Sequence, residues 1–359
     1  MTKIMKIPEN LIIENKIEMI KETPAILEAA NLLHQGEVVS FPTETVYGLG
    51  ADAANAKAVK KIFKAKGRPQ DNPLIVHITG EAQLKKIISS SLNQKVQKLV
   101  NAFWPGPLTI IFEKSGLIPD RTTAGLNTVA VRMPSHPVAR ALIEKTGLPL
   151  AAPSANISGA PSPTTAEHVF KDLKGLIPLI IDGGPSPVGV ESTVIDVRGK
   201  EPQLLRPGGV PLEAIESIIG EKIDRTVKKT NKEKPISPGM KYRHYSPETP
   251  LFLIDMDNKN FEAILKDEYK KYHKIALVLT SEKVDKMKRI LEKSANWTAE
   301  QINIVNIGSQ FQVDVIASRL FKLLRQLDEE DYSLILVETI PEKGLGAAVM
   351  NRLHKASIQ

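Results

Sequence analysis

The sequence predicts an α/β protein with two domains, a mixed sheet in residues 1–212 and a smaller, Rossmann-like parallel sheet in residues 251–359. The chain has 359 residues, more than one ordinary domain contains. In the first part, several strand-type runs follow one another with no helical stretch between them, which a purely parallel sheet does not allow. In the last part, four apolar runs alternate with stretches of helical length, which is typical of a parallel sheet covered on both faces.

Capping residues mark the helices expected in the first domain. Thr23 and Pro24 suit the N-cap and first position of a helix that Gly36 can end. The amphipathic run from Ala56 to Lys66 predicts a helix that stops at Gly67. The expected strands are rich in β-branched residues and cover residues 36–41, 73–78, 108–114, 128–133, 148–154, 176–182, 192–197 and 202–206.

Between the domains we expect a basic linker at residues 213–250. Residues 221–250 lack apolar periodicity and are dense in Lys and Pro. The strands expected for the parallel sheet beyond it cover residues 251–255, 275–280, 302–308 and 334–340.

Composition excludes several classes of protein. The absence of cysteine excludes disulfides, thiolate catalysis and cysteine metal sites. No apolar run approaches the ~20 residues that span a bilayer, so we expect a cytoplasmic protein without a membrane partner. The net charge of +7 lies before residue 251. It fits either a nucleotide or nucleic-acid partner or a merely lysine-rich solvated surface.

The standard nucleotide and metal motifs are absent or weak. No Walker A or HExxH sequence is present. The run GLGADA at residues 48–53 matches the dinucleotide fingerprint, but PTETVY separates it from the preceding strand. A nicotinamide enzyme is therefore a poor interpretation.

Polar clusters at strand ends are the stronger signal. They lie at residues 41–52, 66–77, 127–134, 152–163 and 182–209, and they hold the cations Lys66, Arg68, Arg132 and Arg206. Taken singly, each cluster is explained by a turn or by a helix C-terminus. Together, cations among hydroxyls and amides suit a polyphosphate with a small zwitterion beside it, and no carboxylate pair favours acid–base hydrolysis.

The motifs FPTETVYGLGAD, KAKGRPQDNPLIVHI, VAVRMP, APSANISG and ESTVID, in this order and spacing, resemble the YrdC-like family over residues 22–212. The family's K-x-R and S-x-N signature is matched by Lys66/Arg68 and Ser154/Asn156. The RHYSP run and the trailing domain resemble the long, two-domain form of threonylcarbamoyl-AMP synthase.

This resemblance implies a twisted mixed sheet around a basic cavity and synthesis of threonylcarbamoyl-AMP from L-threonine, bicarbonate or CO₂, and ATP. It implies pyrophosphate release, Mg²⁺ accompanying ATP with no ligand from protein side chains, and a downstream tRNA threonylcarbamoyl transferase machinery as partner. The implied catalytic residues are Lys66 and Arg68. The implied threonine-binding residues are Thr45, His77, Arg132, Ala152 (through its backbone) and Ser192. The implied ATP-binding residues are Arg68, Asn72, Thr128, Ser154, Asn156, Ser162, Arg206 and Tyr245.

A mechanism follows as a hypothesis. The threonine amine forms a carbamate, whose oxygen attacks the α-phosphorus of ATP. We expect Arg132 to clamp the threonine carboxylate bidentately, Lys66 and Arg68 to offset negative charge, and Tyr245 to close as a lid.

Two alternatives stay open. The first is a non-catalytic module with weak binding to tRNA or other RNA, supported by the linker cations Lys222, Arg225, Lys228, Lys229, Lys232 and Lys234. The second is carbamoyl transfer to another acceptor on the same scaffold, because a fold does not determine a substrate.

Overall fold

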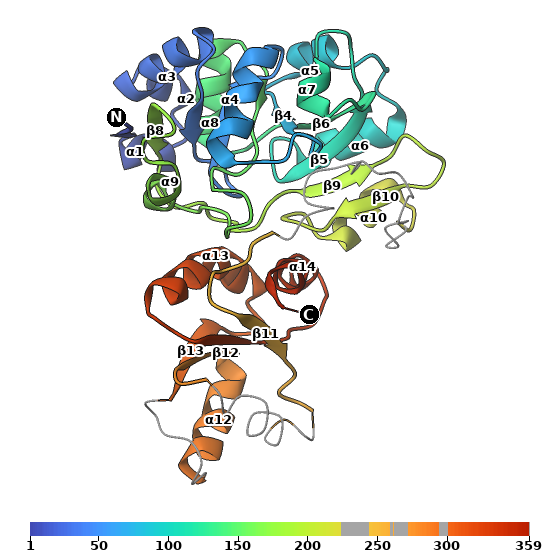
Figure 1. Ribbon diagram of the computed structural model, residues 1–359. Helices are drawn as coiled ribbons and strands as arrows, with labels where there is room; N and C mark the ends of the chain where they lie inside the picture. The colour runs from blue at the N-terminus through green and yellow to red at the C-terminus, as the bar shows by residue number, and fades with distance from the viewer. Residues whose placement is uncertain (224–243, 259–260, 262–271, 294–300, 359) are drawn as a thin grey trace. The chain divides into compact units, whose positions relative to one another are not determined.

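The computed structural model describes residues 1–223, 244–258, 261, 272–293 and 301–358 (Figure 1). The chain divides into two compact units. The first unit comprises Met1–Ser158 and Ser162–Tyr242, and the second comprises Gly159–Pro161 and Arg243–Gln359. Each unit is described by itself below.

The first unit is built on a ten-stranded sheet with the order β1-β8-β2-β3-β7-β4-β6-β5-β9-β10. Its strands are β1 (Lys3–Lys6), β2 (Val39–Phe41), β3 (Gly48–Asp52), β4 (Ile75–His77), β5 (Leu108–Glu113), β6 (Thr128–Arg132), β7 (Leu150–Ala151), β8 (Leu179–Asp182), β9 (Thr193–Asp196) and β10 (Gln203–Arg206). Parallel pairs such as β4–β6 and β5–β9 alternate with antiparallel pairs such as β5–β6 and β3–β7. The predicted mixed sheet is confirmed.

Two strands, β1 and β3, were not predicted. Strand β3 contains the GLGAD run that resembled a nucleotide fingerprint, and it pairs antiparallel with β2. Its glycines serve packing instead of phosphate binding. A Cβ on Gly50 would lie 2.5 Å from Cε1 of Phe41, so only glycine fits beside this ring.

The two helices predicted for the first unit are confirmed. Helix α3 (Pro24–His34) follows Thr23, and α4 (Ala56–Lys66) ends at Gly67, whose φ of 60° is left-handed. Asn55 caps α4 by accepting the backbone N–H groups of residues 57 and 58. The other helices are α1 (Glu9–Ile13), α2 (Ile17–Lys21), α5 (Glu81–Ile87), α6 (Gln94–Phe103), α7 (Asp120–Thr123), α8 (Pro137–Thr146), α9 (Ala166–Leu173) and α10 (Leu212–Ile219).

Helix α10 changes the expected start of the linker. Leu212, Ile215 and Ile219 are buried in the main core of the first unit, so residues 213–219 belong to a packed helix. Their spacing of three and four residues places them on one helical face. Residues 224–243 of the expected linker lie outside the described residues.

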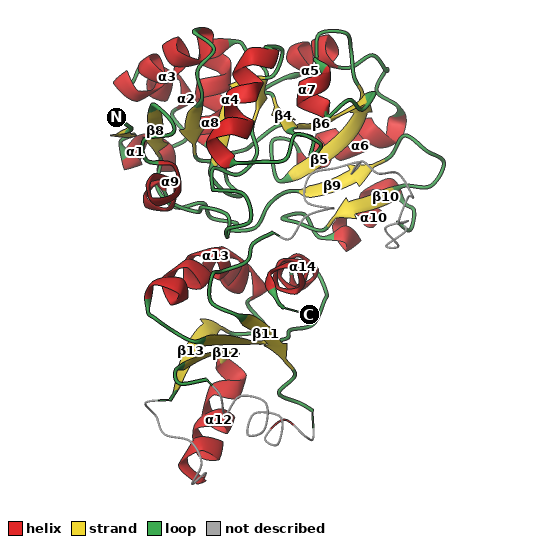
Figure 2. Cartoon of the chain, viewed as in Figure 1, coloured by secondary structure: helices red, strands yellow, loops and turns green. Residues whose placement is uncertain are grey.

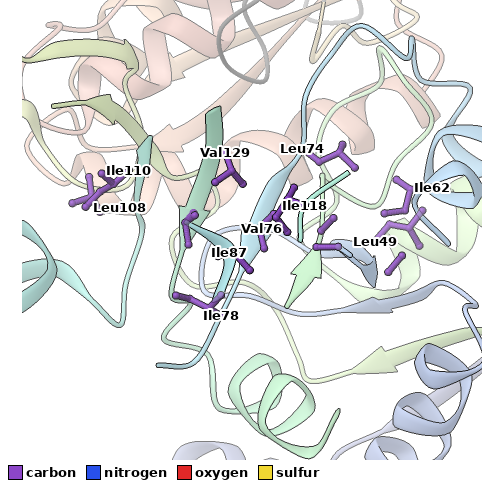
Figure 3. Close-up of a cluster of buried hydrophobic side chains, with 14 of the residues drawn as sticks. Leu49, Ile62, Leu74, Val76, Ile78, Ile87, Leu108, Ile110, Ile118 and Val129 are labelled. Carbon is purple, nitrogen blue, oxygen red and sulfur yellow. The ribbon is translucent and has the colours of Figure 1, made fainter. Parts of the chain in front are cut away.

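The strands next to the site alternate strictly between two faces. Val76, Ile110, Val129 and Val131 belong to the main core (Figure 3). Residues at the alternate positions of the same strands point to the opposite face. Ile75, Ile111 and Ala130 form a small cluster there with Val194 and Leu205. Because successive side chains of a strand point to opposite faces, this second face also carries His77, Thr109, Arg132 and Thr128. We call it the site face.

The second unit is the predicted parallel sheet. Its strands are β11 (Leu251–Ile254), β12 (Ile275–Thr280), β13 (Ile302–Gly308) and β14 (Leu334–Glu338), in the order β11-β14-β12-β13. Every pair is parallel. Helix α12 (Ser281–Lys293) lies on one face, and α13 (Val313–Glu329) and α14 (Gly346–Ala356) lie on the other (Figure 2). Among the residues that the structure describes, no helix is both long and apolar enough to cross a membrane.

Candidate functional site

Neighbouring strands bring His77, Arg132 and Thr109 into one row on the site face. Arg132 of β6 is the register partner of His77 in β4 and of Thr109 in β5. The three side chains are buried and point the same way, because register partners share a face. A fully apolar strand end would be the ordinary outcome in a buried sheet, so this polar row indicates a binding site.

The Arg132 guanidinium is held on three sides. Its Nε donates to the Gly106 carbonyl at 3.2 Å, and its Nη1 donates to Thr45 Oγ1 at 2.8 Å. Its Nη2 forms an ion pair with Glu44 Oε1 at 2.6 Å. Since a guanidinium has five N–H donors, three contacts leave two donors for a ligand.

Sequence reasoning did not identify Glu44 as the carboxylate that pairs with Arg132. Both side chains of the pair are almost fully buried, at 4% exposed for Arg132 and 7% for Glu44. The glutamate lies between two threonines in PTETVY, and nothing in that run alone indicates its partner. The ion pair forms because the loop between β2 and β3, which carries Glu44, lies against Arg132 of β6.

His77 is a neutral side chain in this site. Burial, assisted by the positive charge of Arg132, lowers its pKa to about 3. Its Nδ1 is buried and has no hydrogen-bond partner among the described residues. A neutral imidazole with an open ring nitrogen suits hydrogen bonding to a small ligand better than ion pairing with one.

Ser192 is linked to the same row through Thr109. The two hydroxyl oxygens lie 2.7 Å apart. Arg206 donates from Nη2 to the Ser192 carbonyl at 3.0 Å and to Ser192 Oγ at 3.2 Å. The structure therefore brings together four of the residues expected to bind threonine. His77 and Arg132 are register partners, Thr45 is hydrogen-bonded to Arg132, and Ser192 is hydrogen-bonded to Thr109, which the sequence did not single out.

Lys66 is engaged by the loop that follows β7. Its Nζ donates to the carbonyls of Ser154 and Asn156, each at 2.5 Å, and lies 3.3 Å from Asn156 Oδ1. Ser154 Oγ donates to the same Oδ1 at 2.6 Å. The two halves of the K-x-R and S-x-N signature thus meet. These three oxygens can occupy all three N–H donors of the ammonium, so the contacts of Lys66 hold the loop at residues 154–156 in place.

The Asn72 side chain is a further buried polar group of this site. It is fully buried, and neither its amide nitrogen nor its amide oxygen has a hydrogen-bond partner among the described residues. Arg68 donates to the carbonyls of Asn72 and Pro73 and fixes the bend that carries it. An unpaired buried amide indicates a position where a ligand supplies the missing hydrogen bonds.

Thr128 lies at the opposite end of β6 from Arg132. Ile75 pairs with Ala130, so Thr128 is level with Pro73, close to Arg68 and Asn72. Four residue steps of strand separate Thr128 from Arg132, a distance of about 13 Å at roughly 3.3 Å per residue. Three of the expected nucleotide residues, Thr128, Arg68 and Asn72, therefore lie toward the opposite end of β6 from Arg132. Arg206 does not, because it contacts Ser192 and is level with Thr109 and Arg132 across the sheet.

Three expected residues have other partners. Ser162 is fully buried and donates to Glu191 Oε1 at 2.5 Å. The Ala152 backbone N–H donates to the Ile75 carbonyl at 2.9 Å, which leaves its carbonyl as the backbone group for a ligand. Tyr245 lies in the second unit, where its ring stacks on Phe321 with centroids 5.3 Å apart.

The side chains near the site include no cluster of metal ligands. Among the described residues, no group of three or more His, Asp or Glu side chains is placed to hold a metal ion. Together, the row on the site face and the Lys66 loop give this α/β protein a buried polar site with two cations, which suits a small polar molecule and an anion.

Comparison with known proteins identifies the family. A family model described as "Telomere recombination" matches residues 31–208, and one described as "Threonylcarbamoyl-AMP synthase, C-terminal domain" matches residues 210–357. The threonylcarbamoyl-AMP synthase of Bacillus subtilis is 47% identical over 342 residues, 95% of each chain. That of Pyrococcus abyssi is 46% identical over 347 residues, covering 96% of this chain and 97% of the relative.

A solved structure agrees over the whole length. The Pyrococcus abyssi Sua5 protein complexed with L-threonine superposes with a TM-score of 0.82 at 42% identity, covering 99% of this chain and 97% of the other. The chain belongs to the two-domain threonylcarbamoyl-AMP synthase family, a family of enzymes.

Proposed function

We propose that this enzyme joins L-threonine, CO₂ or bicarbonate, and ATP into threonylcarbamoyl-AMP with release of pyrophosphate. The observation that carries the proposal is the row of His77, Arg132 and Thr109 on the site face, with Ser192 hydrogen-bonded to Thr109. It combines one oriented cation, a neutral imidazole and hydroxyls, which suits a small hydroxylated amino acid. The full-length relatives carry the name of this reaction, and one is a complex with L-threonine.

Arg132 binds the threonine carboxylate in this proposal. Its two remaining N–H donors can reach one carboxylate oxygen each, while Glu44, Thr45 and Gly106 keep the guanidinium plane from rotating. Ser192 and His77 are placed to hydrogen-bond the threonine hydroxyl or amine, and the Ala152 carbonyl accepts a further hydrogen bond. Fixed orientation lowers the entropic cost of bringing the amine to its reaction partner.

The nucleotide lies toward the Thr128 end of β6. Asn72 offers an unpaired amide there, and Arg68 and Thr128 lie beside it. Lys66 contributes positive charge from its loop with Ser154 and Asn156, and Ser162 belongs to the same set. Arg206, which contacts Ser192, lies where the nucleotide and threonine sites would meet. Mg²⁺ would accompany ATP, held by phosphate oxygens and water, and would offset part of the phosphate charge.

The chemical step is a nucleotidyl transfer. The threonine amine loses a proton and bonds to the carbon of CO₂, which yields a carbamate. A carbamate oxygen then attacks the α-phosphorus in line, and the bond from that phosphorus to the bridging oxygen breaks as pyrophosphate leaves. Lys66 and Arg68 offset the negative charge, so the protein contributes mainly positioning and electrostatics.

The product would supply a tRNA threonylcarbamoyl transferase machinery.

Tyr245 is assigned to cover the nucleotide, and the adjacent His244 completes a His-Tyr pair. A Pyrococcus abyssi Sua5 structure is of a variant in which one histidine and one tyrosine are replaced by alanine.

Pyrophosphate release tests the proposal. The assay contains ATP and Mg²⁺, with L-threonine and bicarbonate added singly and together. We expect release only when both are present, with the mass of threonylcarbamoyl-AMP in the quenched mixture. Release without threonine would point to another acceptor. Absence of both turnover and nucleotide binding would overturn the proposal, and salt-dependent tRNA binding would then favour the RNA-binding alternative.

A further inference from the structure

We propose that Glu44 receives the α-amino group of the L-threonine substrate with one carboxylate oxygen while the other holds Arg132. The inference rests on the proposed function, because it assigns one more contact in the threonine site. Glu44 would then be a binding residue for the amine and a positioning residue for the guanidinium.

The first observation is the geometry of the ion pair. Glu44 Oε1 lies 2.6 Å from Arg132 Nη2, and the two side chains are 7% and 4% exposed. The glutamate is therefore adjacent to the group that binds the threonine carboxylate. In an amino acid the ammonium lies only two bonds from the carboxylate carbon, so a group next to the carboxylate clamp is within reach of the amine.

The second observation is the unsatisfied carboxylate. Both oxygens of Glu44 are buried, and neither accepts a hydrogen bond among the described residues. Oε1 has its ion pair with Arg132, whereas Oε2 has neither a hydrogen bond nor an ion pair within the described part of the chain. A buried charged oxygen without a donor is costly to a folded protein. An α-ammonium group carries three N–H donors and a positive charge, so it supplies what this carboxylate lacks.

The charges around Glu44 favour the same assignment. Arg132 is the cation of the pair. His77 and His136 are both neutral, since burial lowers their pKa values to about 3 and about 4. The nearby Thr43 and Thr45 are uncharged and bind each other at 2.8 Å. Within this group Glu44 is the single anion, and an arginine beside a glutamate matches the two charges of a zwitterion.

The loop that carries Glu44 is held in place. The Glu44 carbonyl accepts the Val188 N–H at 2.8 Å, and Thr43 Oγ1 donates to the Val46 carbonyl at 2.7 Å. A carboxylate on a fixed loop is preorganised for a ligand and does not need to be ordered on binding.

Two analogues separate the roles of Glu44. 3-Hydroxybutyrate keeps the carboxylate and hydroxyl of threonine and lacks the amine, whereas L-threoninamide keeps the amine and has no carboxylate charge. Binding of threonine and both analogues is measured by titration calorimetry on the full chain and on the E44Q variant. The E44D variant, which keeps the charge, serves as the conservative rescue. E216Q is the matched control, because Glu216 is also a buried glutamate ion-paired in the first unit.

We expect E44Q to weaken the binding of threonine and threoninamide by about ten- to a hundredfold. The binding of 3-hydroxybutyrate should change less than about threefold. E44D should recover part of the loss, and E216Q should bind like the unsubstituted chain. Thermal unfolding of each variant verifies that it is folded.

The opposite pattern would overturn the inference. Equal loss of threonine and 3-hydroxybutyrate, with threoninamide spared, would mean that Glu44 only orients Arg132. Unchanged binding of all three compounds would remove Glu44 from the site. If the unsubstituted chain itself failed to bind threonine, the proposed function would fail, which separates that failure from a failure of the Glu44 assignment.

Discussion

At the residue scale, the first unit carries buried polar groups where an ordinary sheet carries apolar ones. The Arg132–Glu44 pair and the unpaired amide of Asn72 are costly in a folded protein unless a ligand or a precise partner compensates. In the strands next to the site, polar side chains such as Arg132 lie on the site face, and valine and isoleucine lie on the opposite face. One face of the same strands therefore carries the candidate binding residues, and the other contributes to the stability of the core.

The planar fork of Arg132 is expected to matter more than its charge. Arg132→Lys keeps a cation but cannot contact Glu44, Thr45 and a carboxylate at once, so the threonine KM should rise about tenfold with the ATP KM unchanged. Steady-state pyrophosphate release measures both constants. Arg198→Lys is the control, since Arg198 pairs with Asp196 at the surface. An unchanged threonine KM in Arg132→Lys would refute the assignment.

The buried histidines make stability depend on pH. The pKa of His136 is lowered to about 4 by burial, below the ordinary value of about 6.5. The unfolded chain therefore binds a proton that the folded chain does not, and the free energy of unfolding falls as pH drops from about 6.5 to about 4. His77 acts in the same direction.

His136→Asn tests this dependence, because asparagine keeps an N-cap for α8 and does not titrate. The slope of unfolding free energy against pH should decrease by up to about 1.4 kcal/mol per pH unit in this window. Urea unfolding at several pH values measures it. A slope equal to that of the unsubstituted chain would show that His136 is protonated in the folded state.

At the element scale, helix α4 carries signature residues at its C-terminal end. Its last residue is Lys66, and the left-handed Gly67 turns the chain toward Arg68 and Asn72. Its start depends on the Asn55 side chain, which accepts two backbone N–H groups.

Asn55→Ala should therefore lower the free energy of unfolding by about 1 kcal/mol, since those N–H groups lose their acceptor. Asn55→Asp keeps an acceptor and should cost much less. Urea denaturation compares the three proteins at one pH. Equal stability of Asn55→Ala and Asn55→Asp would show that the cap does not stabilise α4.

At the scale of the whole molecule, two units have separate hydrophobic cores. The core of the second unit contains Leu277, Leu334 and Leu336, and the first unit has its own clusters around Val131 and Leu142. Separate cores predict separate unfolding transitions, because cooperativity requires shared buried contacts.

Leu336→Ala should lower the unfolding temperature of one transition only, at a cost of about 2–5 kcal/mol. Leu142→Ala, a matched change in the first unit, should lower the other. Differential scanning calorimetry resolves the two. A single transition that shifts equally in both variants would mean that the units unfold as one.

The sequence by itself determined the parallel sheet of the second unit, eight of the ten strands of the mixed sheet, the helices at residues 24–34 and 56–66, and the cations of the site. Those features are local, since alternation, capping residues and glycine stops act within a few positions. The YrdC-like motifs also identified Arg132, His77 and Ser192 as candidates before any contact was visible.

Only the tertiary structure decided how those candidates are partnered. Glu44 and Thr109 enter the site because a loop and a neighbouring strand place them against Arg132 and Ser192, across 88 and 83 residues of sequence. β3 became a strand because Gly50 admits the Phe41 ring, and residues 212–219 became a helix because the main core buries their apolar face. Each of these outcomes depends on long-range packing, which no short stretch of sequence encodes.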